Sequence, residues 1–495
     1  MRRQLDMLLV RAGAPKHVYG ALADIELPAL EPPLWAALLA AWVRNKGFTV
    51  DIIDTEVDTS GSAAIAHAID SLNPLLVVFV VIGNNLSAST WHMCAASEYH
   101  AALKDVSDVS TLFWGLHPSA LPQRTLAEEG CDFVCEGEGF GTLVDLVDRL
   151  KRSQPVAGVP GLHWTDGDGV FAAGPAATLL ADLDELPTPA WDLLPMDAYR
   201  AHNWHCFQDL AHRQPYGVVY TSLGCAFDCS FCSLKRLFAG KRGVRFRSPK
   251  KVIEDIRVLV EDYGVKNIKI LDECFVLRES HVIELCDLIY ERGYDLNMWA
   301  YSRVDTVNQR MLSAMRAAGM RWLAYGIESG TREVLDGVQK GRYGEADIRE
   351  AVRATQEAGI YVVGNYMFGL PADDEASMRA TLGLSKELLC EYANFYVTMA
   401  YPGSALYGEA LAAGTRLPES WSGYSQLSED TLPLPTRQLT AEDVLRFRDA
   451  AFTDYHTDEA YLRMMKRRFG AEVVDHVKRM AAHPLKRAIL STPGG

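Results

Sequence analysis

The sequence predicts an α/β protein with two parallel-sheet units, a doubly wound sheet over residues 1–150 and a partial (β/α)6 barrel over 206–425. Apolar runs of strand length alternate with amphipathic helices in both stretches, which is typical of parallel sheets. The chain has 495 residues, more than one hydrophobic core normally serves. From about residue 430 only helical periodicity remains, so we expect a helical region over 426–495.

The first unit is indicated by five short apolar runs, each followed by a helical pattern. Strands are predicted near residues 5–13, 48–54, 75–83, 110–115 and 132–137. In doubly wound sheets the loops after the strands form the ligand crevice. Those loops are rich in Gly, Asn and Ser here, which suits close approach of a large polar ligand. The candidate contacts in them are Asn84, Ser87, Ser89, His117, Glu136 and Gly137.

Residues 151–205 change character, and we expect them to link the two units. The stretch 159–175 is typical of a β-hairpin, and 183–200 is punctuated by proline. The strand–helix alternation then resumes, with strands predicted over 216–224, 267–273, 296–303, 322–330, 360–369 and 393–403. Six such units favour a partial barrel over a closed eightfold one.

Composition narrows the class of protein. The formal net charge of −15 repels nucleic acid and anionic lipid, so we expect neither as a partner. The apolar run near the N-terminus is interrupted by Asp6 and is too short for a signal peptide. The longest apolar run, 75–82, is far shorter than a membrane-spanning helix. We therefore expect a soluble, cytoplasmic protein. The acidic balance is compatible with a cationic aminosugar as substrate.

The most informative motif is C-x3-C-x2-C, formed by Cys225, Cys229 and Cys232. Four thiolates would close a zinc site or saturate a four-iron cluster, whereas three leave one iron open for another ligand. The segment 216–224 before the motif reads as a strand that ends in Gly224. The cysteines should thus lie at the carboxyl end of a barrel strand, where barrel enzymes keep their chemistry.

This cysteine loop resembles the radical S-adenosylmethionine (SAM) superfamily, whose motif carries an aromatic residue where this chain has Phe231. The resemblance implies a [4Fe–4S] cluster on the three thiolates, SAM at the open iron, a 5′-deoxyadenosyl radical, and a one-electron reductant such as flavodoxin or ferredoxin. It also implies SAM contacts at the later strand ends, for which the candidates are Asp272, Glu273, Ser302, Arg303, Gly326 and Glu328. Candidates that face the substrate are Cys274, Tyr366 and Tyr401.

Residues 1–150 resemble the cobalamin (B12)-binding domain that precedes many radical SAM enzymes. The resemblance depends on the stretches 31–47, 83–90, 117–122 and 132–143. It implies cobalamin as a third cofactor, and the six loop candidates of this unit, residues 84, 87, 89, 117, 136 and 137, as its contacts. The sequence departs from the family pattern at Leu116, where a glycine is common, and this bulk could disfavour a corrin.

The leading hypothesis is cobalamin-dependent C-methylation of a small natural-product or sugar substrate. The alternatives are a cobalamin-free radical dehydratase of the kind found in aminoglycoside antibiotic pathways, and a radical epimerase that uses Cys274 as hydrogen donor. A further alternative, from another class of protein, is a non-catalytic metal-binding module with zinc on the cysteines.

Overall fold

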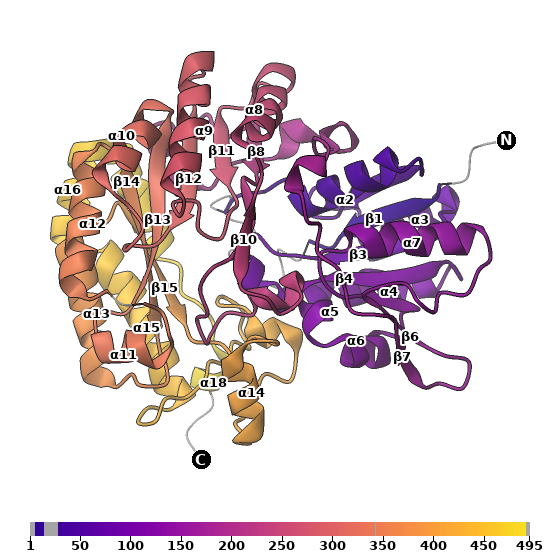
Figure 1. Ribbon diagram of the computed structural model, residues 1–495. Coiled ribbons are helices and arrows are strands. Elements are labelled where there is room, and N and C mark those ends of the chain that lie inside the picture. The colour runs from indigo at the N-terminus through magenta and orange to yellow at the C-terminus, as the bar shows by residue number, and fades with distance from the viewer. Residues whose placement is uncertain (1–4, 14–27, 342, 492–495) are drawn as a thin grey trace.

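The computed structural model describes residues 5–13, 28–341 and 343–491. It contains two large sheets, each covered by helices, which lie side by side with the N-terminal half of the chain on one flank (Figure 1). This confirms the predicted α/β class. Most of the loop after the first strand, residues 14–27, lies outside the described part.

The N-terminal sheet has seven strands in the order β2-β1-β3-β4-β5-β6-β7. Its first five strands are parallel: β1 (Met7–Arg11), β2 (Val50–Asp54), β3 (Leu76–Val81), β4 (Ser110–Gly115) and β5 (Phe133–Cys135). The hairpin predicted in the linker is β6 (Leu162–Thr165) and β7 (Phe171–Ala173). Because β6 pairs antiparallel with β5, the hairpin extends this sheet instead of standing apart from it.

Successive side chains along each strand point to opposite faces of this sheet. Leu9 and Val78 pack on one face against α2 (Leu34–Asn45) and α7 (Phe140–Lys151). Leu8 and Phe79 pack on the other against α3 (Ser62–Leu72), α4 (Met93–Lys104) and α6 (Pro122–Glu129). The sheet is therefore doubly wound, as the pattern predicts.

The second sheet has six parallel strands in the order β15-β14-β13-β12-β11-β8. They are β8 (Tyr216–Val219), β11 (Asn267–Ile270), β12 (Asn297–Ser302), β13 (Met320–Glu328), β14 (Tyr361–Phe368) and β15 (Tyr392–Val397). The helices of this half are α8 (Pro249–Arg257), α9 (Glu279–Arg292), α10 (Gln309–Ala317), α11 (Arg332–Gly337), α12 (Glu345–Glu357) and α13 (Glu375–Leu388). Since β8 and β15 end the strand order, the barrel is partial and open.

The strand predicted over 216–224 is two strands. After β8 the chain turns, and β9 (Ser222–Cys225) pairs antiparallel with β10 (Gly243–Phe246) in a small separate sheet. The turn forms because Thr221 and Ser222 donate hydrogen bonds to the carboxylate of Asp272. Gly224 has φ +99°, and a Cβ there would lie 2.3 Å from the carbonyl oxygen of Gly243. Cys225 is thus the last residue of the hairpin strand β9, and Cys229 and Cys232 follow that strand, not the barrel strand itself.

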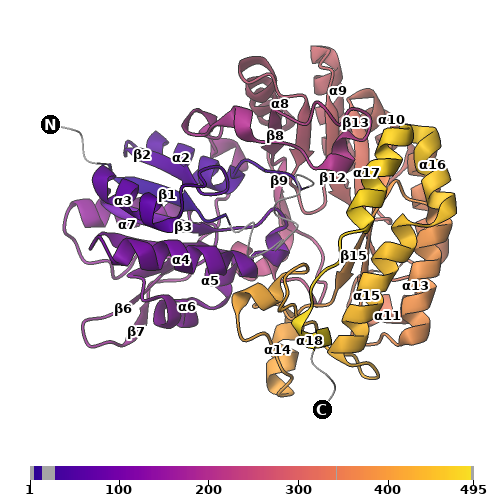
Figure 2. The ribbon, with the colours of Figure 1, turned by 180° about the vertical axis from the view of Figure 1, so that it is seen from behind.

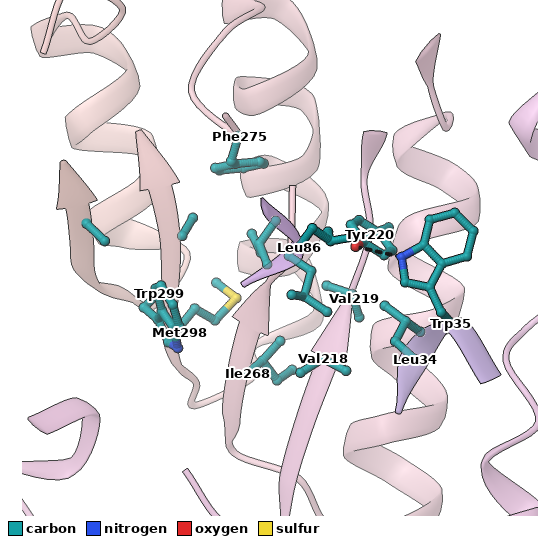
Figure 3. Packing of buried hydrophobic residues seen from close by; sticks show 14 of the residues in the cluster. Leu34, Trp35, Leu86, Val218, Val219, Tyr220, Ile268, Phe275, Met298 and Trp299 are labelled. Atoms are coloured by element: carbon teal, nitrogen blue, oxygen red, sulfur yellow. Dashed lines mark hydrogen bonds between the residues drawn. The ribbon is translucent and has the colours of Figure 1, made fainter. Parts of the chain in front are cut away.

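The two sheets share one hydrophobic core. Leu34 and Trp35 of α2, with Leu86, pack toward Val218, Val219 and Tyr220 of the barrel (Figure 3). Trp35 Nε1 donates to the hydroxyl of Tyr220 at 3.1 Å. A buried ion pair between Lys269 and Glu31, 3.0 Å, adds a polar link across the same contact.

The C-terminal region is helical, as predicted, with α15 (Ala441–His456), α16 (Glu459–Phe469), α17 (Ala471–Ala481) and α18 (Ala488–Ser491), after the shorter α14 (Ala405–Ala412). These helices lie along the β15 side of the barrel (Figure 2). Gln426 exchanges two hydrogen bonds with the backbone of Val397, and Arg448 Nε donates to the carbonyl of Phe395 at 2.7 Å. This region therefore pairs the open edge of β15, which would otherwise be exposed.

Candidate active site

A cavity of about 220 Å³ lies at the carboxyl ends of the barrel strands, against the N-terminal unit. Twelve of the residues predicted from sequence line it: Ser87, Cys225, Cys229, Phe231, Cys232, Glu273, Cys274, Ser302, Arg303, Gly326, Glu328 and Tyr401. The strand order explains this convergence, because parallel strands end at one edge of the sheet. Asn85, Ser87 and Ala88 enter from the loop after β3, so both units form the wall.

The three motif cysteines have free thiols and lie close enough together to influence one another's pKa. Burial raises the pKa of Cys225 to about 11, and the charges of Glu273 and Cys229 add to this effect. Such thiols need a cation to become thiolates. Among the described residues no group of three His, Cys, Asp or Glu is arranged around a single metal ion. A four-iron cluster presents a separate iron to each thiolate, so this donor set fits it.

Arg303 follows β12 and is buried in the cavity wall. Asp305 accepts from its Nε at 2.9 Å and from its Nη2 at 3.0 Å, and the ring of Phe227 lies 3.7 Å from the guanidinium carbon. Its Nη1 is buried and has no hydrogen-bond partner among the described residues. A fixed guanidinium with one free donor is suited to a carboxylate ligand.

The two neighbouring acids at the end of β11 have different surroundings. The buried Asp272 is used by Thr221 and Ser222 and does not line the cavity. Glu273 lines the cavity, and no described residue donates a hydrogen bond to its carboxylate. Burial, together with the charge of Asp272, raises the pKa of Glu273 to about 8. Glu273 is therefore the acid available to an ammonium group, while Asp272 shapes the chain that leads to the cysteines.

A buried ion pair forms the wall after β13. Lys340 Nζ lies 2.7 Å from Glu328 Oε1, and both side chains are about nine-tenths buried. Glu328 has φ +62°, and the register of β13 shifts beside it, which turns its side chain toward the cavity. A Cβ on Gly326 would come within 2.7 Å of both charged groups, so glycine leaves room for the pair. Sequence reasoning missed Lys340, because it lies twelve residues after the strand end in a loop with no motif.

The substrate-facing candidates separate into two groups. Cys274 and Tyr401 line the cavity, and burial raises the pKa of each to about 12, so both keep their protons at neutral pH. Tyr366 does not line it. Its ring is fully buried and its hydroxyl lies 3.8 Å from the sulfur of Cys390. Ser302 lines the cavity, but its hydroxyl donates to the carbonyl of Arg303.

The loop after β3 uses most of its polar groups on its own structure. Ser89 is fully buried, accepts from Gly83 N at 3.0 Å and donates to Leu86 O at 2.7 Å. Asn84 accepts from Arg11 through its side chain and from Lys269 through its carbonyl. Neither residue lines the cavity, whereas Ser87 does.

In the loops after β4 and β5, the residues predicted to contact a ligand make contacts within the protein instead. His117 is buried against the ring of Trp421, 4.4 Å between centroids, and its Nε2 has no partner among the described residues. Burial lowers the pKa of His117 to about 3, so its ring is neutral. Gly137 accepts from Trp114 Nε1 at 2.8 Å, and Glu136 pairs with His163 at 2.9 Å. These three residues lie outside the cavity wall.

Leu116 does not add bulk on the ligand side. Its side chain is buried in the main hydrophobic core, with 2 % exposed. Gly115 before it has φ +139°, and a Cβ there would lie 2.2 Å from the carbonyl of Val81, so the tight turn uses glycine at that position. The departure from the family pattern therefore gives no reason to expect an empty cobalamin site.

Comparison with known proteins supports the same assignment. Residues 219–384 match the Radical SAM superfamily model, and residues 22–147 match the B12 binding domain model. An uncharacterized methyltransferase of Pyrococcus horikoshii is 31 % identical over 427 residues, covering 86 % of this chain and 88 % of that protein. The anaerobic magnesium-protoporphyrin IX monomethyl ester cyclase of Rubrivivax gelatinosus is 26 % identical over 76 % of this chain and 66 % of that protein.

A solved structure shares the fold. The radical S-adenosylmethionine methyltransferase TsrM from Kitasatospora setae, with cobalamin and a [4Fe–4S] cluster bound, matches with a TM-score of 0.70 at 18 % identity, covering 97 % of this chain and all of that one. A radical SAM domain uses a [4Fe–4S] cluster and SAM, and a B12 binding domain adds cobalamin; these are the cofactors of the chain. Three free thiols, an acid that accepts no hydrogen bond from a described residue, and a guanidinium whose Nη1 has no partner among the described residues lie in one cavity and fit these cofactors. The chain is therefore an enzyme of the radical SAM superfamily, in the group that carries a B12-binding domain before the radical SAM domain.

Proposed function

We propose that the enzyme methylates an unactivated carbon of a small molecule, with SAM and cobalamin acting in one shared cavity. The observation that carries the proposal is the composition of the cavity wall. Residues 85, 87 and 88 of the B12-binding unit line the same space as the three motif cysteines of the barrel. When bound, the cluster and SAM supply the 5′-deoxyadenosyl radical, and cobalamin supplies the methyl group.

The barrel residues have distinct duties in this proposal. Cys225, Cys229 and Cys232 hold the cluster and leave one iron open. Glu273 binds the ammonium group of SAM and Arg303 Nη1 binds its carboxylate, since Glu273 accepts no hydrogen bond from a described residue and Nη1 has no partner among them. Burial raises the pKa of Glu273 to about 8 in the empty cavity, and the positive charge of a bound ammonium group would favour the ionised carboxylate. The two contacts orient the sulfonium toward the open iron.

Apolar side chains keep water from the reacting space. Phe227, Phe231, Met367 and Met399 contribute to the wall between the charged groups. A radical that attacks C–H bonds must meet substrate and not a stray side chain or solvent, and a dry wall serves that need. Cys274 is the exception, because its protonated thiol is an easily abstracted hydrogen atom donor in the same wall.

The electron that starts the reaction comes from a one-electron donor such as flavodoxin or ferredoxin. The cysteine loop supports this, because Cys225, Cys229 and Cys232 are only partly buried and Ala226 between them is exposed. A docked donor can thus approach the cluster from outside the barrel.

The direct test is an anaerobic incubation of reconstituted enzyme with SAM, reductant and a panel of small natural products and sugars, read by mass spectrometry. We expect one product that gains a single carbon, with 5′-deoxyadenosine and S-adenosylhomocysteine formed in equal amounts. The control is the same incubation with Cys232→Ser enzyme. Loss of water from a substrate, with 5′-deoxyadenosine and no S-adenosylhomocysteine, would show a dehydratase instead.

A further inference from the structure

A second, larger cavity of about 960 Å³ lies beside the site, between the edge strand β15, helix α15 and the C-terminal segment 480–491. Tyr396 and Gln426 line both cavities. The two walls also touch at Asn394, a residue of the larger cavity, which donates to Asn365 in the wall of the smaller one at 3.0 Å. The larger cavity therefore adjoins the reaction site, on the open side of the barrel.

The wall of this second cavity is cationic, although the chain as a whole has a net charge of −15. Four of its residues are Arg446, Arg448, Lys486 and Arg487, against two acids, Glu429 and Asp449. His202 in the same wall stays neutral, because burial lowers its pKa well below the ordinary value.

The buried part of this charge is a triad in which one acid serves two bases. Asp449 lies 2.8 Å from Arg448 Nη1 and 2.9 Å from Arg487 Nε. The two arginines are only 6 % and 3 % exposed. Although burial opposes it, the hydrogen bonds from Arg487 and the charge of Arg448 lower the pKa of Asp449 below its ordinary value, so the acid is ionised. The triad therefore keeps one excess positive charge inside the protein.

Hydrogen bonds within the protein use all the donors of Arg487, and these bonds hold the C-terminal segment in place. They do not use all the donors of Arg448. Arg487 spends its remaining donors on Ser428 O, Thr431 Oγ1 and Gln426 O. Arg448 uses Nε for Phe395 O and Nη1 for Asp449. Its Nη2 has no acceptor among the described residues, and the side chain lines the cavity. Burial and the adjacent Arg487 lower the pKa of Arg448, as expected for a cation that lacks sufficient compensation.

A buried cation that shares its acid with a second arginine is only partly compensated, which is costly unless an anion accompanies it. A carboxylate or a phosphate is the natural complement of a planar guanidinium with free donors. Lys486 and Arg446, both exposed at the rim, add attraction for an incoming anion.

We propose that this cavity holds the substrate and that Arg448, assisted by Lys486 and Arg446 at the rim, binds an anionic group of it, a carboxylate or a phosphate. The proposal rests on the proposed function only in making the smaller cavity the place of reaction. It replaces the expectation of a cationic aminosugar, because the net acidity of the chain does not extend to this cavity.

The test measures anion binding to full-length, cluster-loaded enzyme under anaerobic conditions. SAM is present at saturation, so that the anion cannot occupy Arg303. Inorganic phosphate and succinate are titrated separately at constant ionic strength, and binding is followed by calorimetry and by the shift of the unfolding temperature. We expect at least one of the two anions to bind and to raise the unfolding temperature.

Three variants locate the binding. Arg448→Gln should weaken it about tenfold or more, and the double variant Arg446→Gln, Lys486→Gln a few fold. Arg463→Gln on α16 is the control, since its exposed side chain does not line the cavity and binding should not change. If Arg448→Gln does not fold, the exposed double variant decides, because it removes no buried group.

The outcomes distinguish a phosphate group from a carboxylate group. They also distinguish failure of the anion-site proposal from failure of the methylation proposal. Preference for phosphate or for succinate identifies the group, and equal binding of both leaves the general acid-group assignment standing. No binding of either anion, or equal binding by wild type and the folded cavity variants, would overturn the inference. Cobalamin retention and S-adenosylhomocysteine formation are read in the same samples, so a failure of the methylation proposal shows independently.

Discussion

The ends of the two parallel sheets meet at the site, yet they use their polar residues in opposite ways. At the barrel end, Glu273 and Arg303 Nη1 have no hydrogen-bond partner among the described residues and line the cavity. At the end of the N-terminal sheet, Ser89 forms hydrogen bonds within its own loop, and Glu136 and Gly137 form theirs with neighbouring elements of the same unit, away from the cavity. The barrel end offers charge to a ligand, whereas the other end offers a shaped surface.

In the proposed function this difference follows from the ligands, since SAM would lie at the barrel end and cobalamin at the other end. SAM carries a charged amino acid portion, so it needs complementary charges fixed in place. A corrin is large and mostly held by shape and backbone approach, so rigid loops serve it better than free charges. The predictions below test that contrast, from the largest expected effect to the smallest.

Removal of any motif thiol should abolish activity. Cys225→Ser, Cys229→Ser and Cys232→Ser each take one ligand from the cluster, and we expect loss of bound iron and sulfide and of reductive SAM cleavage. Metal analysis and a 5′-deoxyadenosine assay measure both. Cys94→Ser is the matched control, since Cys94 is also a free, partly buried thiol but lies outside the cavity. Equal iron loss in that control would contradict the assignment.

Replacement of Arg303 should weaken SAM binding by about tenfold or more, because lysine cannot reproduce a guanidinium held by Asp305 with one donor free. Calorimetry on cluster-loaded Arg303→Lys enzyme measures this. Arg310→Lys is the control, as the Arg310 side chain is 76 % exposed and forms its ion pair with Glu279, away from the cavity. Unchanged affinity in Arg303→Lys would show that SAM is held elsewhere.

Replacement of two serines of the loop after β3 should reduce the stability of the protein by different amounts. Ser89→Ala leaves Gly83 N without its acceptor in a buried loop, and we expect a loss of about 1–3 kcal/mol of unfolding free energy. Ser87→Ala removes only a bond to the exposed Asn85, so the cost should be about 0.5 kcal/mol or less. Chemical denaturation of the cobalamin-free protein measures both. Equal costs would mean that this loop is not built around Ser89.

His117 should make the enzyme sensitive to mild acid. Folding lowers its pKa to about 3, whereas an unfolded histidine titrates near pH 6.5. The unfolded state thus binds a proton that the folded state excludes, so stability is full above about pH 6.5 and falls as the pH drops toward 3. His117→Gln should reduce the loss of stability between pH 7.5 and 5.5 by about 1 kcal/mol. An unchanged pH dependence in cobalamin-free protein would show that His117 is solvated.

The sequence predicted the layout of the fold and the cluster motif well, because both depend on local periodicity and spacing. It did not predict the break between β8 and β9, since hydrophobicity continues through Thr221 and the cause, Asp272, lies fifty residues away. The same long-range contact removes Asp272 from the cavity. The sequence also did not predict that Lys340 lines the site, because the ion pair between Lys340 and Glu328 depends on a register shift in β13.

The C-terminal helices are a second feature that the sequence predicted only in part. Their amphipathic pattern predicted helices but not what they cover. Arg448 and Gln426 act on the edge of β15, and a parallel sheet's edge is visible only once the strand order is known. Leu116 is similar, because the direction of one side chain at a turn decides whether its bulk lies in the core or beside a ligand.

The measurement that tests the shared cavity most directly needs no substrate. Enzyme reconstituted with its cluster and cobalamin is mixed anaerobically with SAM and reductant, and bound cobalamin and S-adenosylhomocysteine are quantified after gel filtration. We predict about one cobalamin retained per chain and S-adenosylhomocysteine formed only when cobalamin is present. Enzyme that retains no cobalamin, or that releases 5′-deoxyadenosine without S-adenosylhomocysteine, would contradict cobalamin-dependent methyl transfer.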